Sequence, residues 1–362
     1  MKKSIPFMIF RGGSSKGIYL KKSDLPNDEK ERNEVIIKIM EGTLEGDSRQ
    51  IDGLGGANSL TSKVAIVSLS EVPDCDLEYY FLQVVVGEGR VSTTQTCGNI
   101  LAGVLPFAIE SGMLKANSPT TSAKINIVNT GGTCECIVQT PENQVEYSGN
   151  TKIDGVVGTA APIICNYLET VGATCGALLP TGKLIDQIDG IETTCIDNGM
   201  PLVIMRASDF GLIGNESKEI LESNVELKTR IENIRILAGL KMNLGDVSNQ
   251  TIPKMCLVSR AQKGGDINTR MFIPHVVHEA IGVLAAVSVA TACLIGGTVC
   301  HAFIEKSKEK SKKNYKDLSI EHPSGEFSLR LHYETNELET KIIKSGVIRT
   351  AKFIAEGNTY IY

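Results

Sequence analysis

The sequence predicts an α+β fold in which many strands surround two very apolar helices, one in each half of the chain. The two helices are expected at 98–112 and 280–300, where small and apolar residues predominate. A helix without a polar face must be covered by other elements, and in each half only strands are available to cover it. Pro180 and Gly182 punctuate the segment LPTGKLID at 179–186, which predicts a boundary between the two halves.

The first half opens with a strand at 5–10, IPFMIF, followed by the turn RGGSSKG at 11–17. A helix is expected at about 28–41, with Asn27 as its N-cap and Gly42 as its terminator. The other strands of this half are expected near 64–69, 77–87, 124–128, 134–140 and 143–148.

The second half repeats this order loosely, with a polar helix expected at about 216–240, although no repeat in the sequence itself proves a duplication. Its strands are expected near 191–197, 202–206, 255–259, 326–334, 338–344 and 347–355. The expected domains are therefore 1–183 and 187–345, with a last strand at about 346–362 completing the first domain.

Composition limits the classes of partner. The 362 residues are 42% hydrophobic and 22% charged, as in soluble globular proteins with a sizeable core. The net charge of −5 argues against nucleic acid or an anionic membrane as the main partner. Ten scattered cysteines form no disulfide framework, and the start, MKKSIPFMIFR, has no signal-peptide cleavage site. We therefore expect a cytoplasmic protein.

Residues 280–300 are uncharged and long enough to cross a bilayer, and the lysine-rich run 306–316 follows them. Against a membrane span, the run consists largely of Ala, Val, Gly, Ser and Thr, which suit close packing against protein. We expect a helix buried by protein, no membrane, and a solvated lysine run.

Two side chains stand out as candidates for proton transfer. Lys63 follows the glycine-rich segment DGLGGANSLTS and leads into an apolar strand, so partial burial is expected to lower its pKa toward that of a base. Cys97 precedes Gly98 and Asn99 at the expected start of a helix, where unpaired backbone N–H groups favour a thiolate. Taken alone, a lysine such as Lys63 is more often a surface residue, and a cysteine such as Cys97 is more often a packed thiol.

The turn RGGSSKG places Ser14, Ser15 and Lys16 beside two glycines, which suits either a plain turn or a loop that binds a carboxylate. It does not match the Walker pattern, and no GxGxxG follows a strand. Cys134-x-Cys136 has no second pair at zinc spacing, and His275-x-x-His278-Glu279 is not in the zincin order. We therefore expect no metal and no organic cofactor.

Taken together, FRGGSSKG, IDGLGGANSLTSKVAIV, TCGNILAGVLPFAIESG, LPTGKLID and EHPSG resemble the PrpF family over essentially the whole chain. That family includes 2-methylaconitate cis-trans isomerase, methylitaconate Δ-isomerase and oxalomesaconate tautomerase. The resemblance implies the diaminopimelate-epimerase-like fold, with two similar domains, each a curved sheet or partial barrel around a central helix, and an active site in the cleft between them. Glu321 stands where the family motif has glycine.

By this resemblance, Lys63 corresponds to the family's catalytic lysine, Cys97 to its active-site cysteine and Ser15 to a serine of its glycine-rich loop. It implies a cofactor-independent isomerase that moves a proton on a small, unsaturated di- or tricarboxylate. Ser14, Ser15, Lys16, Gly98 and Asn99 are expected to bind substrate, and Arg270 and His278 are expected to hold a distal carboxylate.

Two other functions are weighed against this one. A non-catalytic accessory protein for an aconitase-like hydratase would keep the cleft without needing both Lys63 and Cys97. A two-thiol racemase or epimerase would need a second cysteine at the start of the second apolar helix, but Cys293 lies deep inside that run. A homodimer is the expected assembly, and cis-trans isomerisation and a double-bond shift remain equally open.

Overall fold

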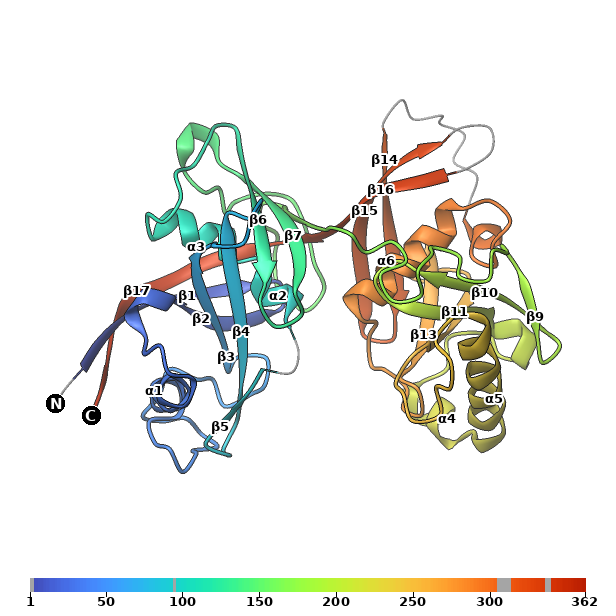
Figure 1. The fold of residues 1–362 in the computed structure, drawn as a ribbon, viewed down its shortest axis with the longest axis horizontal. Helices are drawn as coiled ribbons and strands as arrows, with labels where there is room; N and C mark the ends of the chain where they lie inside the picture. The colour runs from blue at the N-terminus through green and yellow to red at the C-terminus, as the bar shows by residue number, and fades with distance from the viewer. Residues whose placement is uncertain (1–2, 94–95, 305–313, 336–339) are drawn as a thin grey trace. The chain divides into compact units, whose positions relative to one another are not determined.

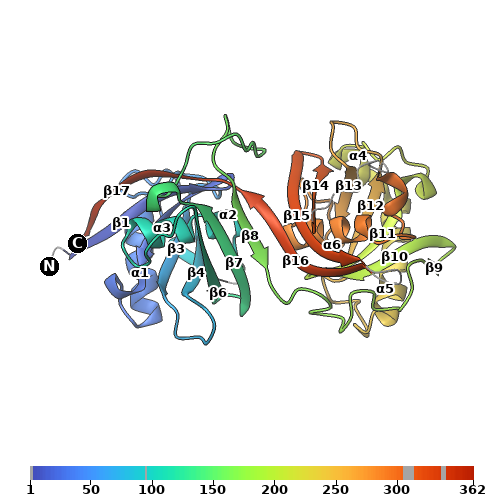
Figure 2. The ribbon, with the colours of Figure 1, turned by 90° about the horizontal axis from the view of Figure 1, so that it is seen from above.

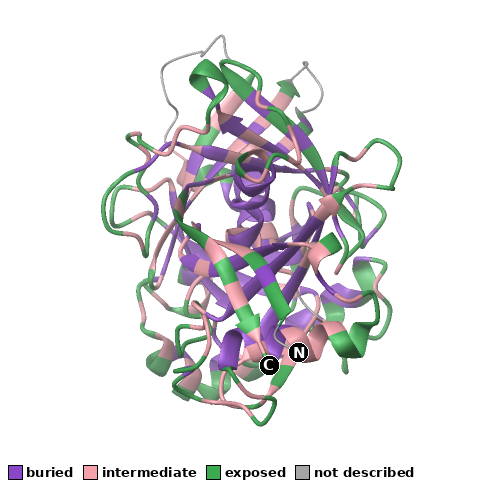
Figure 3. Cartoon of the chain, turned by 90° about the vertical axis from the view of Figure 1, so that its left-hand side faces the viewer, coloured by how far each residue is buried: buried purple, intermediate pink, exposed green. Residues whose placement is uncertain are grey.

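The computed structural model describes residues 3–93, 96–304, 314–335 and 340–362 and confirms the α+β class. Strands dominate and the helices are few (Figure 1). The chain divides into two compact units, residues 1–168 with 348–362, and residues 169–347. In both, the buried positions follow the strands and inner helices, while the connecting loops are largely exposed (Figure 3).

The sheet of the first unit begins with the last strand of the chain, which pairs antiparallel with the first (Figure 2). From there the pairings run antiparallel, parallel, antiparallel, parallel, antiparallel and antiparallel. In that order the strands are β17 (Ala351–Ile361), β1 (Lys3–Gly12), β2 (Ser15–Lys21), β3 (Lys63–Leu69), β4 (Leu77–Val85), β6 (Thr120–Ile127), β7 (Gly132–Gln139) and β8 (Ile163–Tyr167), and the short β5 (Arg90–Ser92) pairs with β4.

The two faces of this sheet are covered by different helices. Ile18 and Leu20 of β2 share a core with α1 (Glu29–Glu41). The residue between them, Tyr19, points to the other face and packs against Phe107 of α3 (Val104–Glu110). Because side chains alternate along a strand, each strand divides its residues between these two faces.

Helix α1 was expected to begin after Asn27, but its N-cap is the next residue, Asp28. The Asp28 carboxylate accepts a hydrogen bond from the N–H of Glu31 at 2.9 Å. Gly42 ends the helix as expected, because its φ of 80° is accessible to glycine without strain.

The first apolar run forms two short helices rather than one. Helix α2 (Gly98–Leu101) and α3 are separated by Ala102 and Gly103. Tyr19 donates its hydroxyl hydrogen to the carbonyl of Ile100 at 2.6 Å. Pro106 has no N–H to continue the ladder, and proline is tolerated only in a first helical turn. The run therefore breaks because Tyr19 occupies the carbonyl of Ile100 and Pro106 has no N–H to donate.

The second unit has a sheet with the same succession of pairings, from an antiparallel β10–β11 pair to an antiparallel β15–β16 pair. The strand β9 (Asp186–Ile188) adds to its first edge. In order the others are β10 (Ile191–Asp197), β11 (Pro201–Arg206), β12 (Lys254–Ser259), β13 (Ile267–Phe272), β14 (Tyr315–His322), β15 (Gly325–Thr335) and β16 (Thr340–Arg349).

The helices of this unit also cover two faces. The expected polar helix is two helices, α4 (Lys218–Ser223) and α5 (Val225–Lys241), because Asn224 caps the second by accepting from the N–H of Leu227. Helix α6 (Val283–Leu294) packs against β10, β11, β14 and β15 (Figure 2). No helix within the described residues is long and apolar enough to cross a membrane. The 3₁₀ turns are η1 (Lys22–Asp24), η2 (Pro141–Asn143), η3 (Ala207–Phe210) and η4 (His301–Phe303).

Several strand predictions were wrong. Residues 143–148 form no strand, since Glu142 and Asn143 have positive φ values of 54° and 61°. Most of the lysine run at 306–316 lies outside the described residues, and its last two residues begin β14. The strands expected at 338–344 and 347–355 are instead β16, which continues to Arg349, and β17, which begins at Ala351.

Candidate active site

Lys63 is the first residue of β3 and lies between two neighbouring strands. It pairs with Gly17 of β2 and with Gln83 of β4. Val64 and Leu82 belong to the core shared with α1, so Lys63 and Gln83 point to the opposite face, that of α2 and α3. Lys63 is 8% exposed, and its Nζ donates to Gln83 Oε1 at 2.6 Å. Burial of Lys63 is thus confirmed.

The Gln83 amide is held in one orientation. Its Nε2 lies 3.0 Å from the carbonyl oxygen of Ser62, 3.1 Å from that of Val84 and 3.2 Å from that of Ser59. Because a carbonyl accepts only from the NH₂ end, the amide oxygen must face Lys63. The Phe81 ring lies 5.3 Å from Lys63 Nζ, and within the described residues Lys63 forms no ion pair.

Sequence reasoning missed Gln83. The available signal was a single amide in the apolar strand LEYYFLQVV. A buried polar side chain needs partners, and here those partners are the candidate base and the backbone that precedes it.

The loop between β1 and β2 is locked to Asn99. Asn99 Nδ2 donates to Ser14 Oγ at 3.1 Å and to Ser15 Oγ at 3.4 Å. A Cβ atom at Gly13, whose φ is +52°, would overlap the Asn99 amide. Only glycine allows this approach, so the glycine turn and the start of α2 form one assembly.

Lys16 and the glycine-rich segment join the same assembly. The N–H of Lys16 donates to the carbonyl of Leu60 at 2.9 Å. A Cβ on Gly56 would lie 3.5 Å from Lys16 Nζ, so this ammonium group lies over the segment that leads to Lys63. A Cβ on Gly17 would lie 2.7 Å from the Lys63 carbonyl and 3.0 Å from the side chain of Ile100 in α2.

Cys97 is the N-cap of α2 and is partly exposed. Its carbonyl accepts from the N–H of Leu101 at 2.9 Å and from Tyr79 Oη at 3.1 Å. Since α2 has only four residues, its dipole is that of a single turn, weaker than the sequence suggested. Cys97 and Cys75 are the partly exposed thiols, and the other eight are buried.

Arg270 and His278 belong to the second unit. Arg270 donates to the carbonyls of Glu216 and Thr269, each at 2.8 Å, and burial lowers its pKa. His278 Nδ1 accepts from the N–H of Ala280 at 2.8 Å, and burial lowers the pKa of His278. Their expected contact with a distal carboxylate stays a prediction.

Other motifs find structural partners. Cys134 and Cys136 are buried in β7, and among the residues described no group of three or more His, Cys, Asp or Glu could hold a metal ion. The Glu321 carboxylate accepts from the N–H groups of Gln262, Lys263 and Gly265 at 2.6–2.9 Å. Glu321, the departure from the family motif, therefore fixes a loop of the second unit.

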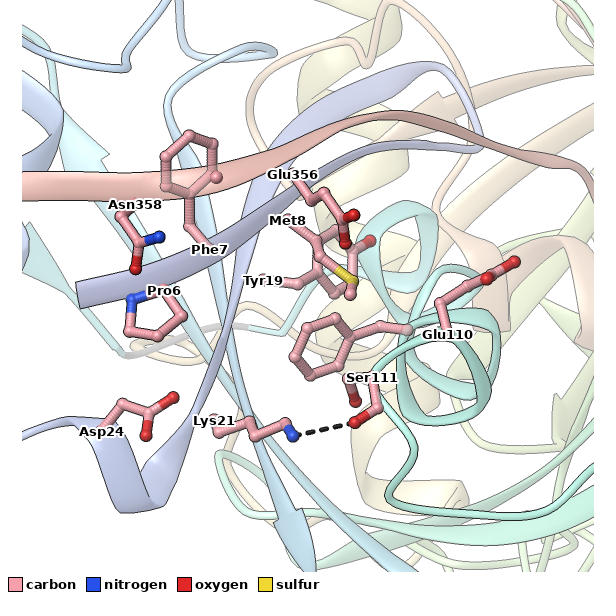
Figure 4. A pocket seen from close by; sticks show the side chains of 12 residues that line it. Pro6, Phe7, Met8, Tyr19, Lys21, Asp24, Glu110, Ser111, Glu356 and Asn358 are labelled. Atoms are coloured by element: carbon pink, nitrogen blue, oxygen red, sulfur yellow. Dashed lines mark hydrogen bonds between the residues drawn. The ribbon is translucent and has the colours of Figure 1, made fainter.

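A cavity of about 570 Å³ in the first unit is a poor alternative site for an anion (Figure 4). Asp24, Glu110 and Glu356 stand around it, and Lys21 Nζ is engaged by the Ser111 carbonyl at 2.8 Å. Carboxylates repel a polyanionic ligand. The cation-bearing assembly around Lys63 suits such a ligand better.

The chain is similar to isomerases over almost its full length. It is 49% identical to the 4-oxalomesaconate tautomerase of Pseudomonas putida, with 98% of this chain and 95% of the relative covered. It is 46% identical to the (4E)-oxalomesaconate Delta-isomerase of a Novosphingobium species, with coverages of 99% and 98%. The crystal structure of methylitaconate-delta-isomerase matches with a TM-score of 0.85 at 32% identity, covering 99% of this chain and 96% of that chain.

These findings define the class: the protein is an enzyme, an isomerase, with the fold of methylitaconate-delta-isomerase. The model of the family described as PrpF protein matches residues 1–362, and the chain belongs to that family.

Proposed function

We propose that the protein shifts a double bond in an unsaturated tricarboxylate of the oxalomesaconate type, by proton abstraction and reprotonation without a cofactor. Two relatives that share nearly half of its residues carry oxalomesaconate in their names. The three motifs of the first unit, gathered on one face of one sheet, support proton transfer at that place.

In this proposal Lys63 is the base. Its neutral amine takes a proton from a carbon next to a carbonyl or carboxylate, and the C–H electron pair moves into a conjugated enolate. The Cys97 thiol gives a proton to the other end of the conjugated system, and the double bond ends one position away. Proton exchange with solvent then restores both groups, so atoms and charge balance.

The developing negative charge needs fixed donors. The Ser14 and Ser15 hydroxyls, held by Asn99, and the ammonium group of Lys16 are available for a carboxylate or enolate oxygen. Such donors are effective because they are in place before the reaction begins.

One observation carries the proposal: a buried lysine, oriented by an amide rather than by a carboxylate, on the same sheet face as the helix that Cys97 caps. A lysine of purely structural use is typically paired with an acid when buried. An amide partner leaves the amine free of a permanent ion pair.

The test is ¹H NMR of the purified protein in D₂O with oxalomesaconate, 2-methylaconitate, methylitaconate and cis-aconitate. We expect oxalomesaconate to turn over fastest, with deuterium entering at the carbon that gains a proton. Lys63→Met should abolish this exchange, and Lys22→Met, at an exposed lysine of the same unit, should leave it unchanged.

Absence of exchange with every acid would contradict the proposal and favour an accessory protein. Co-elution with an aconitase-like hydratase, and the expected homodimer, are checked by size-exclusion chromatography. Exchange at a saturated α-carbon with inversion would instead indicate a racemase.

A further inference from the structure

The segment between α1 and β3, residues 42–62, leads to Lys63 without forming a helix or a strand. Residues 51–61 are exposed or partly exposed, whereas Gln50 is 3% exposed and Ser62 is fully buried. A buried amide needs hydrogen-bond partners, so the partners of Gln50 indicate where this segment is held.

Two residues of this segment other than glycine have a left-handed backbone. The φ value is 52° at Gln50 and 54° at Ala57. Residues that carry a side chain avoid this region unless the surrounding structure holds them there. The two are joined directly, because Gln50 Oε1 accepts a hydrogen bond from the N–H of Ala57 at 2.8 Å. The side chain of Gln50 therefore stabilises the turn in which it lies.

The same amide oxygen reaches the residue before Lys63. Ser62 Oγ donates to Gln50 Oε1 at 2.7 Å. Because the N–H of Ala57 can only donate, the oxygen end of the amide must face Ala57 and Ser62. The other end, Nε2, lies 3.5 Å from Oε1 of Glu41, the last residue of α1. Gln50 is thus fixed in one orientation between α1 and the start of β3.

Glu41 connects this amide to the sheet as well as to the helix. It is fully buried, and its carboxylate accepts from the N–H of Gly87 at 2.6 Å and from that of Gly89 at 3.1 Å. Both glycines lie in the turn between β4 and β5. The amino end of Gln50 therefore faces a carboxylate that is itself held by the folded strands.

Ser62 is held from two sides. Its hydroxyl donates to Gln50, and its carbonyl accepts from the N–H of Val84 at 3.1 Å and from Gln83 Nε2 at 3.0 Å. Gln83 is also the residue that accepts from Lys63 Nζ. One chain of hydrogen bonds therefore runs from Gln50 through Ser62 and Gln83 to the lysine amine.

We propose that Gln50 is a positioning residue for Lys63: through Ser62 it fixes the first residue of β3 and the amide that receives the lysine amine. Gln50 acts through these groups and not on the reacting atoms. A base displaced by about 1 Å can lose about 10²-fold in rate, so its place must be fixed before the reaction. The inference rests on the proposed function for its effect on turnover, but the placement of Lys63 is measured without substrate.

The test is Gln50→Gly, which removes the amide and leaves a residue that adopts a φ of 52° without strain. Asp74→Gly is the matched control, because Asp74 is an exposed residue of the same unit with a φ of 61°. With oxalomesaconate as substrate, we expect Gln50→Gly to lower kcat about 10–10²-fold and to change KM less than about twofold, since the base is misplaced but substrate still binds. Asp74→Gly should match the parent protein.

Ser62→Ala tests the path between Gln50 and Lys63. It should lower kcat in the same direction as Gln50→Gly. The double variant should be at most about twofold slower than the slower single variant, because both changes break the same link. Losses that multiply in the double variant would show that Gln50 acts elsewhere. An unchanged kcat in folded Gln50→Gly protein would refute the role.

The measurement that needs no substrate is trace acetylation of Lys63 by acetic anhydride, followed by peptide mapping, with the exposed Lys22 as internal reference. We expect the Lys63 to Lys22 ratio to rise at least about threefold in Gln50→Gly and Ser62→Ala, since a released start of β3 opens more often. It should stay unchanged in Asp74→Gly. An unchanged ratio in Gln50→Gly would overturn the proposal whether or not the parent protein turns over any acid. A raised ratio in that variant, with a parent protein that is inactive toward every acid, would contradict only the proposed function.

Discussion

The two units use the same succession of strand pairings, yet their corresponding positions hold different chemistry. In the first unit the parallel β2–β3 pair begins with Gly17 and Lys63, and in the second the parallel β11–β12 pair begins with Leu202 and Lys254. Cys97 caps the inner helix of the first unit, whereas Gly282 caps α6.

The difference lies in the surroundings of the two lysines. Lys63 is buried against Gln83, while Lys254 is half-buried and its pKa is lowered by burial and by the charge of Arg235. Cys293, the thiol within α6, is buried in the last turn, far along the helix from the cap. A shared scaffold therefore does not imply a shared site, and α6 has no cysteine at its cap for a two-thiol mechanism.

The largest expected difference is in turnover, between the variants of Lys63 and Lys254. Lys63→Met should lower turnover of the best substrate by about 10²–10⁴-fold, the usual contribution of a general base. Lys254→Met should change it less than about threefold, because no amide partner of Lys254 occurs among the described residues and Gly282, not a cysteine, caps α6. Steady-state NMR or absorbance assays measure both. Equal losses in the two variants would mean that both units supply the base.

The next largest difference in turnover is expected between variants of the two partly exposed thiols, Cys97 and Cys75. Cys97→Ser should lower turnover about 10²-fold, since a hydroxyl is a far weaker acid than a thiol. Cys75→Ser should leave it unchanged. Substrate should also protect Cys97, and not Cys75, from iodoacetamide. A fully active Cys97→Ser enzyme would remove the thiol from the mechanism.

A third prediction compares glycine turns of the two units. Gly13→Ala adds left-handed strain and overlap with Asn99, whereas Gly211→Ala, with a φ of +70°, meets nothing within 4 Å. Gly211→Ala should cost about 1 kcal/mol of unfolding free energy, and Gly13→Ala about 2–4 kcal/mol. Urea unfolding measures both. Equal costs would show that the glycine turn is not locked to α2.

The smallest effect concerns charge. A tricarboxylate should raise the Tm by about 2–4 °C for each kcal/mol of binding, and a monocarboxylate much less. Lys16→Met should reduce this shift and Lys22→Met should not. Higher ionic strength should weaken it through screening. Differential scanning fluorimetry measures these shifts in Tm. An unchanged shift in the Lys16→Met protein would mean that Lys16 does not bind the anion.

Local signals in the sequence predict the elements whose structure is locally determined. Gly42 ends α1 because a left-handed residue is needed there, and Lys63 begins β3 where the glycine-rich segment ends. The N-cap was misplaced by one residue, since Asn27 and Asp28 are both competent and only the register of the first turn selects Asp28.

What the sequence could not predict depends on distant partners. Strand β14 carries charged residues, and its pairing with β13 and β15 makes it a strand. Gln83 has no motif, because its role arises from a lysine and backbone carbonyls brought near by the fold. The Cys97 helix was expected to be long, and Tyr19, about 80 residues earlier, helps to break it.

Because β1 pairs with β17, the two units are completed at different times during synthesis. Ser4 of β1 donates to Asn358 of β17, 354 positions further along the chain. The second unit, by contrast, is one continuous stretch from Glu169 to Val347. A ribosome therefore completes the second unit while the first unit still lacks its edge strand β17. The half of the molecule that holds the candidate chemistry is the last to be finished.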